Sequence, residues 1–474
     1  MLVLMTFLVG TAVASGPDTL WVRTIDVGGD ATGEGITSRG DVIAVAGNAW
    51  TSVFSDLVAL RLNQNGDTLW FRRYSAGGNE CGSSAYLDAQ LNVFVAGYSS
   101  IISAHSGRSR FHTCSQPLGL HSCALVVKYD SSGALQWVDS VPGDMAFGIT
   151  ADSADDCYVW GTHYVSDTTS DLWLGKLAPN GETLWTKTYH VAPRACGMLL
   201  ASNSSGEIVG CAQAASSANS DCMTLRFTPD GDTIWTRRYD YSINDQCWGV
   251  ALDPSGNVVV SGSVANDTAK GLVLKYDSSG TLLWSKLFGL DMDVKLGGAA
   301  CDSAGNIYVS GYAGPDTNCS CLLMKLDSAG GKLWSATYRG SLGVNSATDV
   351  ACDDSGNPII TGCVTNPLGY DDFLVSKYSS LAGISQSHVD EPSRARTMTT
   401  ITALPEFVLW VPNSAFYSVK LCDVTGRMLR QLYRGGLSQG PHRLSLGGTR
   451  AGSYFVRVTS PSAAVSFQRL VLVK

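Results

Sequence analysis

The chain has 474 residues, of which 45% are hydrophobic, 16% are charged and 51 are glycine. This composition excludes a disordered chain, and it favours short strands with tight turns over long solvated helices. The formal net charge of −8 argues against a nucleic-acid partner, because binding phosphates requires a basic surface.

The N-terminal stretch MLVLMTFLVGTAVA is almost wholly apolar, but it is too short to span a bilayer as a helix, which needs roughly 20 residues. It ends in Ala12-Val13-Ala14, the small-x-small pattern of a signal-peptidase site. We therefore predict a signal peptide over residues 1–15 and an exported protein; the alternative is a buried first strand. No other segment is long and apolar enough to cross a membrane, so we expect no transmembrane span.

Internal repetition dominates residues 16–380. Seven tryptophans end similar phrases, such as NGDTLW and SGTLLW, at intervals of 48 to 50 residues with one interval of 67. These residues are Trp21, Trp70, Trp137, Trp185, Trp235, Trp284 and Trp334. A fixed period of this length is typical of repeat architectures.

Each unit of about 50 residues reads as four strands. A short run of small residues (GVALD, 249–253) precedes a turn and a β-branched run (GNVVVSG, 256–262), and then an apolar run ends in a basic residue (GLVLKY, 271–276). The Trp-containing run is the fourth strand. Asp at the start and Gly near the end of the turns fit short hairpin loops, because Gly tolerates positive φ.

Seven such units predict an all-β chain folded as a seven-bladed β-propeller with four-stranded antiparallel blades. The first unit holds only its fourth strand, at 19–24, and the last ends with its third strand, at 372–378. The N-terminal strand is therefore expected to close the last blade. We expect the repeated tryptophans to be structural, in the core between adjacent blades; the alternative is a row of rings that stack on a ligand.

The turn and Trp phrases of residues 16–380 resemble the bacterial seven-bladed β-propeller repeat family labelled SBBP. The resemblance implies an exported or surface protein and implies no substrate.

The charge changes sign near residue 385, because residues 390–474 hold 11 Lys and Arg against 4 Asp and Glu. Residues 381–400 are rich in Ser, Thr and Arg and read as a linker. Residues 401–474 contain about six short alternating runs separated by Gly turns, which predicts a small Ig-like β-sandwich.

The C-terminal phrases CDVTGRMLRQL, AGSYFVRV and LVLVK resemble the type A sorting domain of the type IX (Por) secretion system. The family pattern falls on Asp423, Gly426, Arg427, Gly452, Tyr454 and Arg457, whereas Cys422 departs from it. The resemblance implies a partner in the secretion machinery, export across an outer membrane, and removal of this domain during release or surface attachment. The alternative is an ordinary carbohydrate-binding or adhesive sandwich.

A long connection of about 25 residues links the second and third strands of one unit, between Gly97 and Cys123. Its Arg108, Arg110 and His112 are candidates for binding an acidic ligand such as a uronic glycan. The segment lacks paired Cys and His ligands, so we predict no metal site. Possible disulfides join Cys114 to Cys123, and Cys211 to Cys222 on neighbouring strands.

Enzyme signatures such as G-x-S-x-G, H-E-x-x-H, a Walker loop or an EF-hand loop are missing from the sequence. We therefore predict a secreted or surface-exposed, monomeric and non-catalytic binding or structural propeller without a cofactor. Its ligand is expected to be a glycan or a surface protein, held by the variable loops rather than by the uniform turns. The alternative is an extracellular polysaccharide lyase or glycosidase with a site at the mouth of the channel.

Overall fold

The computed structural model is all-β, with strands β1 to β35. The residues that it describes are 17–27, 29–50, 54–100, 122–141, 143–166, 168–203, 206–215, 219–265, 268–289, 292–340, 342–382, 400–402, 406–411, 415–422, 427–438, 440–445, 452–460 and 463–472. The chain divides into two compact units, Met1–Ile384 and Ser385–Lys474. The described part of the chain holds no helix with the length and apolarity needed to cross a membrane.

The strands of the first unit pair antiparallel in successive groups of four, and each group is called a blade. Blade 1 consists of β2 (Ala31–Arg39), β3 (Val42–Trp50), β4 (Ser55–Asn63) and β5 (Thr68–Tyr74), and blade 2 of β6 (Asn79–Leu87), β7 (Val93–Ser100), β8 (Ser122–Tyr129) and β9 (Leu135–Val141). Blade 3 consists of β10 (Met145–Ala151), β11 (Cys157–Tyr164), β12 (Ser170–Leu177) and β13 (Thr183–Tyr189), blade 4 of β14 (Arg194–Ser202), β15 (Ile208–Ala215), β16 (Ser220–Phe227) and β17 (Thr233–Tyr239), and blade 5 of β18 (Asn244–Leu252), β19 (Val258–Ala265), β20 (Ala269–Tyr276) and β21 (Leu282–Phe288). Blade 6 consists of β22 (Val294–Cys301), β23 (Ile307–Ala313), β24 (Ser320–Leu326) and β25 (Lys332–Tyr338), and blade 7 of β26 (Leu342–Cys352), β27 (Pro358–Thr365), β28 (Asp371–Ala382) and β1 (Pro17–Ile25). The strands of a blade are called a to d in this order. Single parallel bridges, from Ser170 to Arg194 and from Ser220 to Asn244, join blades 3, 4 and 5 into one larger sheet.

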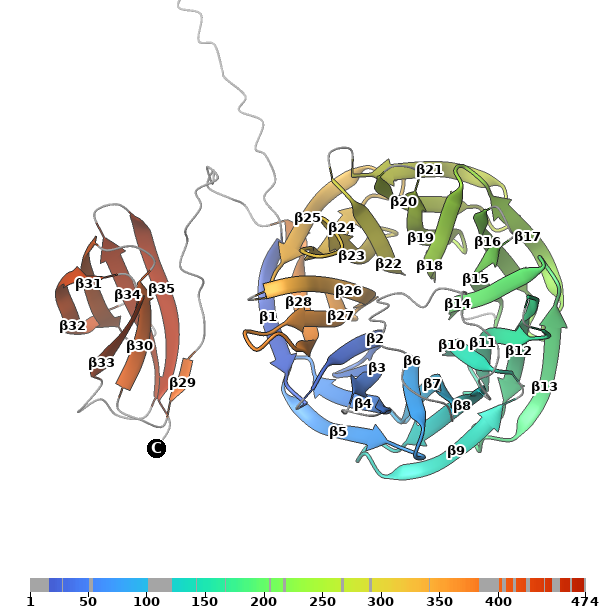
Figure 1. The fold of residues 1–474 in the computed structure, drawn as a ribbon, viewed down its shortest axis with the longest axis horizontal. Coiled ribbons are helices and arrows are strands. Elements are labelled where there is room, and N and C mark those ends of the chain that lie inside the picture. The colour runs from blue at the N-terminus through green and yellow to red at the C-terminus, as the bar shows by residue number, and fades with distance from the viewer. Residues whose placement is uncertain are drawn as a thin grey trace, which may run out of the picture. The chain divides into compact units, whose positions relative to one another are not determined.

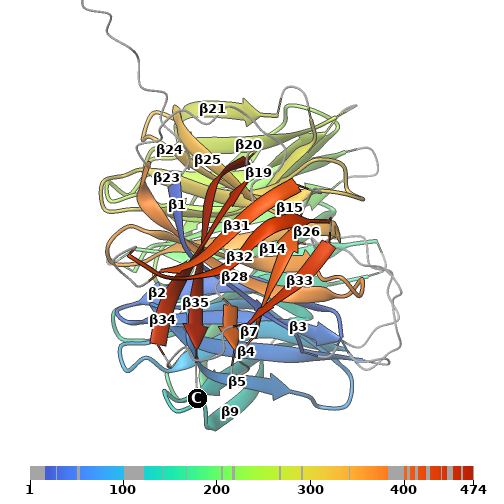
Figure 2. The same ribbon diagram turned by 90° about the vertical axis from the view of Figure 1, so that its left-hand side faces the viewer.

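The blades stand around a central axis, with the strands a nearest to the axis and the strands d at the circumference (Figure 1). Figure 2, the view turned by 90°, shows β3, β4 and β5 lying side by side in blade 1. The all-β propeller predicted from the sequence is thus confirmed, and the sheets are consistent with the predicted number of blades.

The N-terminal strand closes the ring. β1 pairs antiparallel with β28, and Val22 lies opposite Ser376. The hydrophobic core crosses the seam to the next blade, because Phe373 of β28 packs in one cluster with Ile43 and Leu60 of blade 1. Both strands of this closing pair are a few residues longer than the repeat indicates.

The core lies between the blades rather than within any one of them. Leu57 of blade 1, for example, packs in one cluster with Val93 and Val127 of blade 2. Strands b are buried almost throughout, as β7 shows, because a neighbouring blade covers each of their faces. Near the axis the strands a approach closely: a Cβ on Gly35 would lie 2.6 Å from the Cα of Ser84 in the next blade, so only glycine fits there.

The second unit consists of two sheets. The five-stranded sheet has the order β29 (Thr400–Thr402), β35 (Ala463–Leu472), β34 (Gly452–Ser460), β31 (Ala415–Cys422) and β32 (Met428–Leu437), and the two-stranded sheet pairs β30 (Glu406–Val411) with β33 (Gly440–Ser445). β29 pairs parallel with β35, and the other pairs are antiparallel. Val419 of β31 and Val456 of β34 are fully buried.

Candidate functional site

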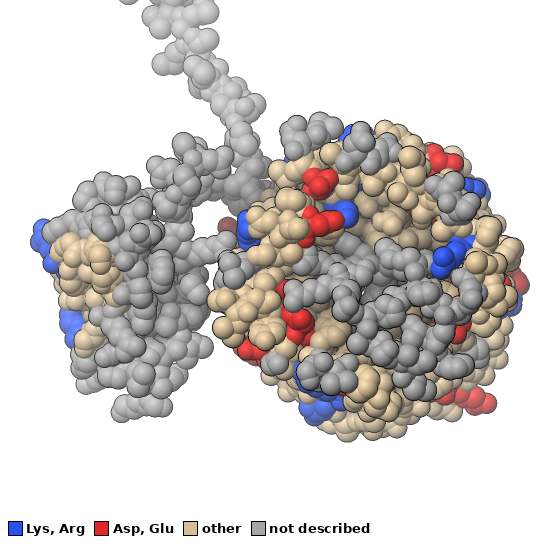
Figure 3. Space-filling model, viewed as in Figure 1, with Lys and Arg blue, Asp and Glu red and all other residues tan. Residues whose placement is uncertain are grey.

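Antiparallel pairing gives the propeller two different faces. The a–b and c–d turns lie on one face, called the turn face, whereas the b–c loops and the d–a connections lie on the opposite face, called the loop face. The part of the surface coloured in Figure 3 is mostly uncharged, and its acidic and basic side chains form small separate groups.

On the turn face of five blades, a lysine at the end of strand c pairs with an aspartate of its own blade, and four of these lysines also donate to the next blade. Arg61 and Arg226 take this position in blades 1 and 4 and donate to the carbonyls of Ser131 and Ser278 in the next blade. Lys275 Nζ lies 2.8 Å from Asp253 Oδ2 in its own blade and donates to the carbonyl of Ser328 in the next blade at 3.1 Å. The indole of Trp284 donates to the same carbonyl at 3.3 Å. Equivalent ion pairs are Lys128–Asp88, Lys176–Asp152, Lys325–Asp302 and Lys377–Asp353.

The turn aspartates are therefore structural groups. Burial opposes their ionisation, but the lysine and the N–H groups of the turn outweigh it and hold the pKa of Asp253 and Asp353 below the usual value. A cavity of about 370 Å³ on this face is lined by Asp253 and Asp302, and both carboxylates are already paired with lysine.

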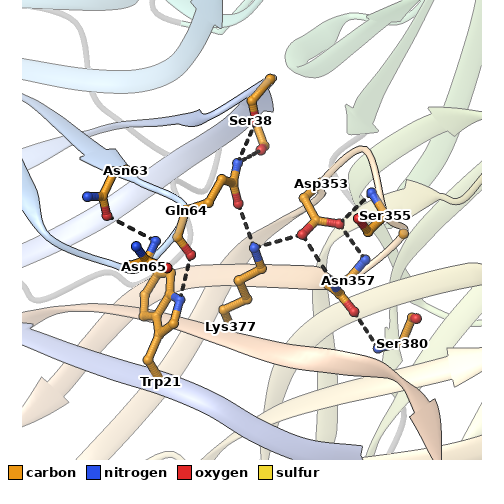
Figure 4. A network of polar contacts seen from close by, with 12 residues as sticks. Trp21, Ser38, Asn63, Gln64, Asn65, Asp353, Ser355, Asn357, Lys377 and Ser380 are labelled. Carbon is orange, nitrogen blue, oxygen red and sulfur yellow. Dashed lines mark hydrogen bonds and ion pairs between the residues drawn. The ribbon is translucent and has the colours of Figure 1, made fainter.

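An equivalent lysine, Lys377, connects blade 7 to blade 1 and so closes the ring (Figure 4). Lys377 Nζ lies 2.7 Å from Asp353 Oδ2 and donates to Gln64 Oε1 at 2.6 Å. The indole of Trp21 donates to the Gln64 carbonyl at 2.9 Å, and Gln64 Nε2 in turn donates to Ser38 Oγ at 2.9 Å. The polar network therefore joins strands c and d of the last blade to the first blade.

The seven repeated tryptophans lie between blades, beside the turns of the turn face. Six of them pack against a positive-φ glycine in the c–d turn of the next blade: a Cβ on Gly280, for example, would lie 2.8 Å from the Trp235 ring. The six pairs are Trp21–Gly66, Trp70–Gly133, Trp137–Gly181, Trp185–Gly231, Trp235–Gly280 and Trp284–Gly330. Trp334 differs because strand c of blade 7 continues to the linker, and its Nε1 finds no hydrogen-bond partner among the described residues.

The other residues singled out in the sequence are only partly described. Arg108, Arg110, His112 and Cys114, and Asp423 and Gly426 of the sorting pattern, lie outside the described residues. Cys123, Cys211 and Cys222 are free thiols in the structure. Gly452 and Tyr454 lie on β34, and Arg427 and Arg457 are exposed.

The loop face carries exposed apolar side chains that the sequence analysis did not identify. They sit in b–c loops or d–a connections: Trp50, Val165, Tyr241, Ile243, Met292, Leu368 and Tyr370. The remaining exposed large apolar side chains described in blades 1 to 7 lie on strands d, just before the repeated tryptophans, apart from Leu381 at the end of β28, on the side of the turn face. Variable loops are where sequence reasoning places function, but exposure of individual side chains needed the structure.

Three aspartates meet on the loop face beside Tyr241. Asp221, Asp240 and Asp245 each offer a carboxylate oxygen, and these oxygens lie within 4.8 Å of one another. Such oxygens suit a hard cation, but Arg238 is paired with the fully buried Asp221. Burial first, and then the two neighbouring carboxylates, raise the pKa of Asp221 against the effect of this arginine.

The third aspartate of this group is engaged by the backbone, since Asp245 Oδ2 accepts the N–H groups of Tyr241 at 2.5 Å and Ser242 at 2.8 Å. The cluster therefore shapes the connection between blades 4 and 5, and a cation would have to displace the guanidinium of Arg238. The phrase D-Y-S-I-N-D at 240–245 is the sequence signal that could have indicated it.

Two carboxyl groups lie near each other on the innermost strands of the closing seam. Asp349 Oδ2 accepts the N–H of Ile36 in blade 1 at 2.9 Å, and its Oδ1 accepts the N–H of Val350 at 2.9 Å. Burial raises the pKa of Asp349 to about 7, whereas burial and the charge of Asp349 raise the pKa of Glu34 to about 8. Carboxyl groups that hold a proton near neutral pH can serve as general acids.

No model of a known protein family matches the chain, and no curated protein matches it either. Among solved structures, the chain is similar to a protein of unknown function from Dyadobacter fermentans (13% identity, 77% of this chain and 99% of that chain, TM-score 0.48). It is also similar to the WD40 β-propeller domain of Doa1 (12% identity, 76% of this chain and 96% of that chain, TM-score 0.47). A third similar structure is a gluconolactonase from Xanthomonas campestris (14% identity, 78% of this chain and 99% of that chain, TM-score 0.38). The assignment of the propeller rests on the strand pairing and does not depend on these likenesses.

Proposed function

We propose that the chain is an exported, non-catalytic β-propeller of the SBBP-like kind that binds an extracellular glycan or surface polymer through its loop face. The observation that carries this proposal is the contrast between the two faces. On the turn face, the aspartates that begin the a–b turns of five blades are paired with lysines, whereas the loop face presents apolar and aromatic side chains to solvent.

The distribution of the exposed rings favours an extended ligand. Trp50 belongs to blade 1, Tyr241 to the connection between blades 4 and 5, and Tyr370 to blade 7. Aromatic side chains of this type combine a large apolar surface with a polar edge, which suits the faces and hydroxyl groups of sugar rings. A polymer can contact several of them at once, so weak individual contacts add to a useful affinity.

A glycan array probed with the purified chain tests this proposal. We expect binding to a subset of polysaccharides, and Trp50→Ala or Tyr370→Ala should each weaken the binding roughly tenfold or more, the effect of losing about 1.5–3 kcal/mol of buried ring surface. Leu69→Ala is the matched control, because Leu69 is 52% exposed and Tyr370 is 50% exposed, but Leu69 lies on an outer strand. Equal losses in the control would place the binding surface elsewhere.

We further propose that the second unit is a type A sorting domain that delivers the chain across an outer membrane. The compactness of residues 385–474 as a separate unit and the exposure of Arg427 and Arg457 support a module that another protein can recognise. Deletion of residues 401–474 should leave the propeller inside the outer membrane of the native host, as measured by fractionation and immunoblotting. Undiminished release of the truncated chain would contradict the sorting role.

A second candidate is an extracellular glycosidase or lyase, favoured by the carboxyl pair Glu34 and Asp349. Both oxygens of Asp349 accept backbone N–H groups, so this residue is better suited to closing the ring than to proton transfer. Turnover of any polysaccharide found on the array, abolished by Glu34→Gln while binding is retained, would favour this enzyme and overturn the non-catalytic assignment.

A further inference from the structure

Three buried thiols meet at the seam between blades 4 and 5. Cys211 lies on β15, Cys222 on β16 and Cys247 on β18, and all three belong to one buried cluster. The pairing of β15 with β16 places Cys211 opposite Thr224, and Gln213 opposite Cys222. The two thiols of blade 4 are therefore not cross-strand partners.

The thiol of Cys247 lies beside the two strands that carry Cys211 and Cys222. Cys247 Sγ lies 2.8 Å from the carbonyl oxygen of Ala212 and 3.6 Å from that of Met223, and these two residues are cross-strand partners. Side chains alternate along a strand, so the neighbours of Ala212 and Met223 point to the face on which Cys247 lies. Burial and the neighbouring Cys247 together raise the pKa of the Cys211 and Cys222 thiols, which agrees with this placement.

This arrangement favours a covalent bond over a metal site. The only group of three possible ligand atoms within 4.8 Å of one another in the described residues is the aspartate cluster of the loop face, so the three sulfurs are more widely spread than that. A tetrahedral thiolate site needs its sulfurs closer together, because each Zn–S bond is only about 2.3 Å long. Cys247 is instead the common neighbour of two alternative partners.

We propose that, on oxidation, Cys247 forms a disulfide with one of the two thiols of blade 4, Cys222 or Cys211, and so joins blades 4 and 5 covalently. With a small disulfide such as oxidised glutathione, one thiolate attacks and forms a mixed disulfide, and one glutathione leaves. The second thiolate then attacks the protein sulfur of the mixed disulfide, and a second glutathione leaves. Two protein thiols lose their protons and are oxidised, and one glutathione disulfide is reduced to two thiols.

The surroundings of the thiols make this seam easier to open than an apolar one. Gln213 Nε2 and Thr224 Oγ1 are buried there and find no hydrogen-bond partner among the described residues. Buried polar atoms without partners destabilise the closed state, and water would satisfy them when the blades separate. Local opening then gives the oxidant access. This inference goes beyond the proposed binding function and does not depend on the ligand or on export.

Peptide mapping of the full chain tests the proposal. The reduced, denatured chain is refolded in a glutathione redox buffer, alkylated and cut after Lys and Arg without reduction. Cys196, Cys211 and Cys222 then fall in the peptide 195–226, and Cys247 falls in the peptide 239–270. We expect these two peptides to be cross-linked, with a mass about 2 Da below the sum of the separate peptides, because two hydrogens are lost.

Variants separate this result from other pairings. The cross-link should persist in Cys196→Ser and should disappear in the double variant Cys211→Ala/Cys222→Ala. A peptide 195–226 that has lost the same mass without being cross-linked would show a bond within blade 4 and overturn the proposal. Complete alkylation of all the thiols after refolding would overturn it as well, and both outcomes are read from the wild-type chain even if a variant fails to fold.

Discussion

The carboxyl group of Asp349 should make the propeller less stable as the pH rises. Asp349 is 7% exposed, and burial raises its pKa from the ordinary value of 3.8 to about 7. Because the folded-state pKa lies above the unfolded value, this residue stabilises the fold fully below about pH 3.8, and the contribution is lost as the pH rises through about 7. The shift corresponds to about 4 kcal/mol between the acid and alkaline limits.

The variant Asp349→Asn removes this titration while keeping the size of the side chain. One of the two hydrogen bonds to the backbone is lost, which costs about 1 kcal/mol at every pH. We therefore expect the variant to be within about 1 kcal/mol of the wild type at pH 5, and more stable by about 3 kcal/mol at pH 9. Urea unfolding followed by tryptophan fluorescence at both pH values measures the difference.

The comparison with Glu34→Gln serves as a control. Glu34 also has a raised pKa, but the residue is more exposed to solvent than Asp349, so screening should make its effect on stability smaller than that of Asp349. Parallel stability profiles of the wild type and Asp349→Asn between pH 5 and pH 9 would refute the argument, because they would mean that the carboxylate is not destabilised by its position in the seam.

Three further predictions concern the ring itself. Gly280→Ala should destabilise the fold by about 2 kcal/mol more than Gly305→Ala, because both glycines have positive φ but only Gly280 faces an indole. Thermal unfolding measures the two losses of stability, and equal losses would contradict the packing of Gly280 against Trp235. Lys377→Met and Lys275→Met should each cost about 3–5 kcal/mol by leaving a buried carboxylate unpaired, and a neutral result at Lys377 would mean that the closing seam is held otherwise. Deletion of residues 17–24 should lower the melting temperature sharply, and an unchanged value would contradict closure by β1.

Most of the fold could be predicted because its determinants are local and repeated. Similar phrases recur from unit to unit: turn residues such as Asp and Gly, a β-branched run, and a strand that contains Trp. The repetition therefore indicates the strands of each blade independently of the others. Closure by β1 could also be predicted, because strand d is missing from the end of the repeat and present at its beginning. The longer bounds of β1 and β28 could not, since strand ends depend on pairing across the seam.

The sequence indicated which residues recur between blades, but it did not indicate which of their side chains interact. Lys275 and Asp253 both belong to recurring phrases, but nothing in either phrase shows that the two side chains meet. The thiols show the same limit. Cys211 and Cys222 lie on neighbouring strands, yet the register places Thr224 opposite Cys211. A register shift of two residues changes which side chains meet, and loop length alone does not determine it.

The uneven use of charge between the two faces is the physical reason for placing function on the loop face. On the turn face, a ligand that recruited Asp253 or Lys275 would have to separate a buried ion pair, at a cost of several kcal/mol and with loosening of the seam between blades. On the loop face, covering Ile243 or Leu368, which are 61% and 80% exposed, removes apolar surface from water and disturbs no bond described in the ring. Binding there leaves the ion pairs of the blades intact, whereas binding through Asp253 or Lys275 would have to break one of them.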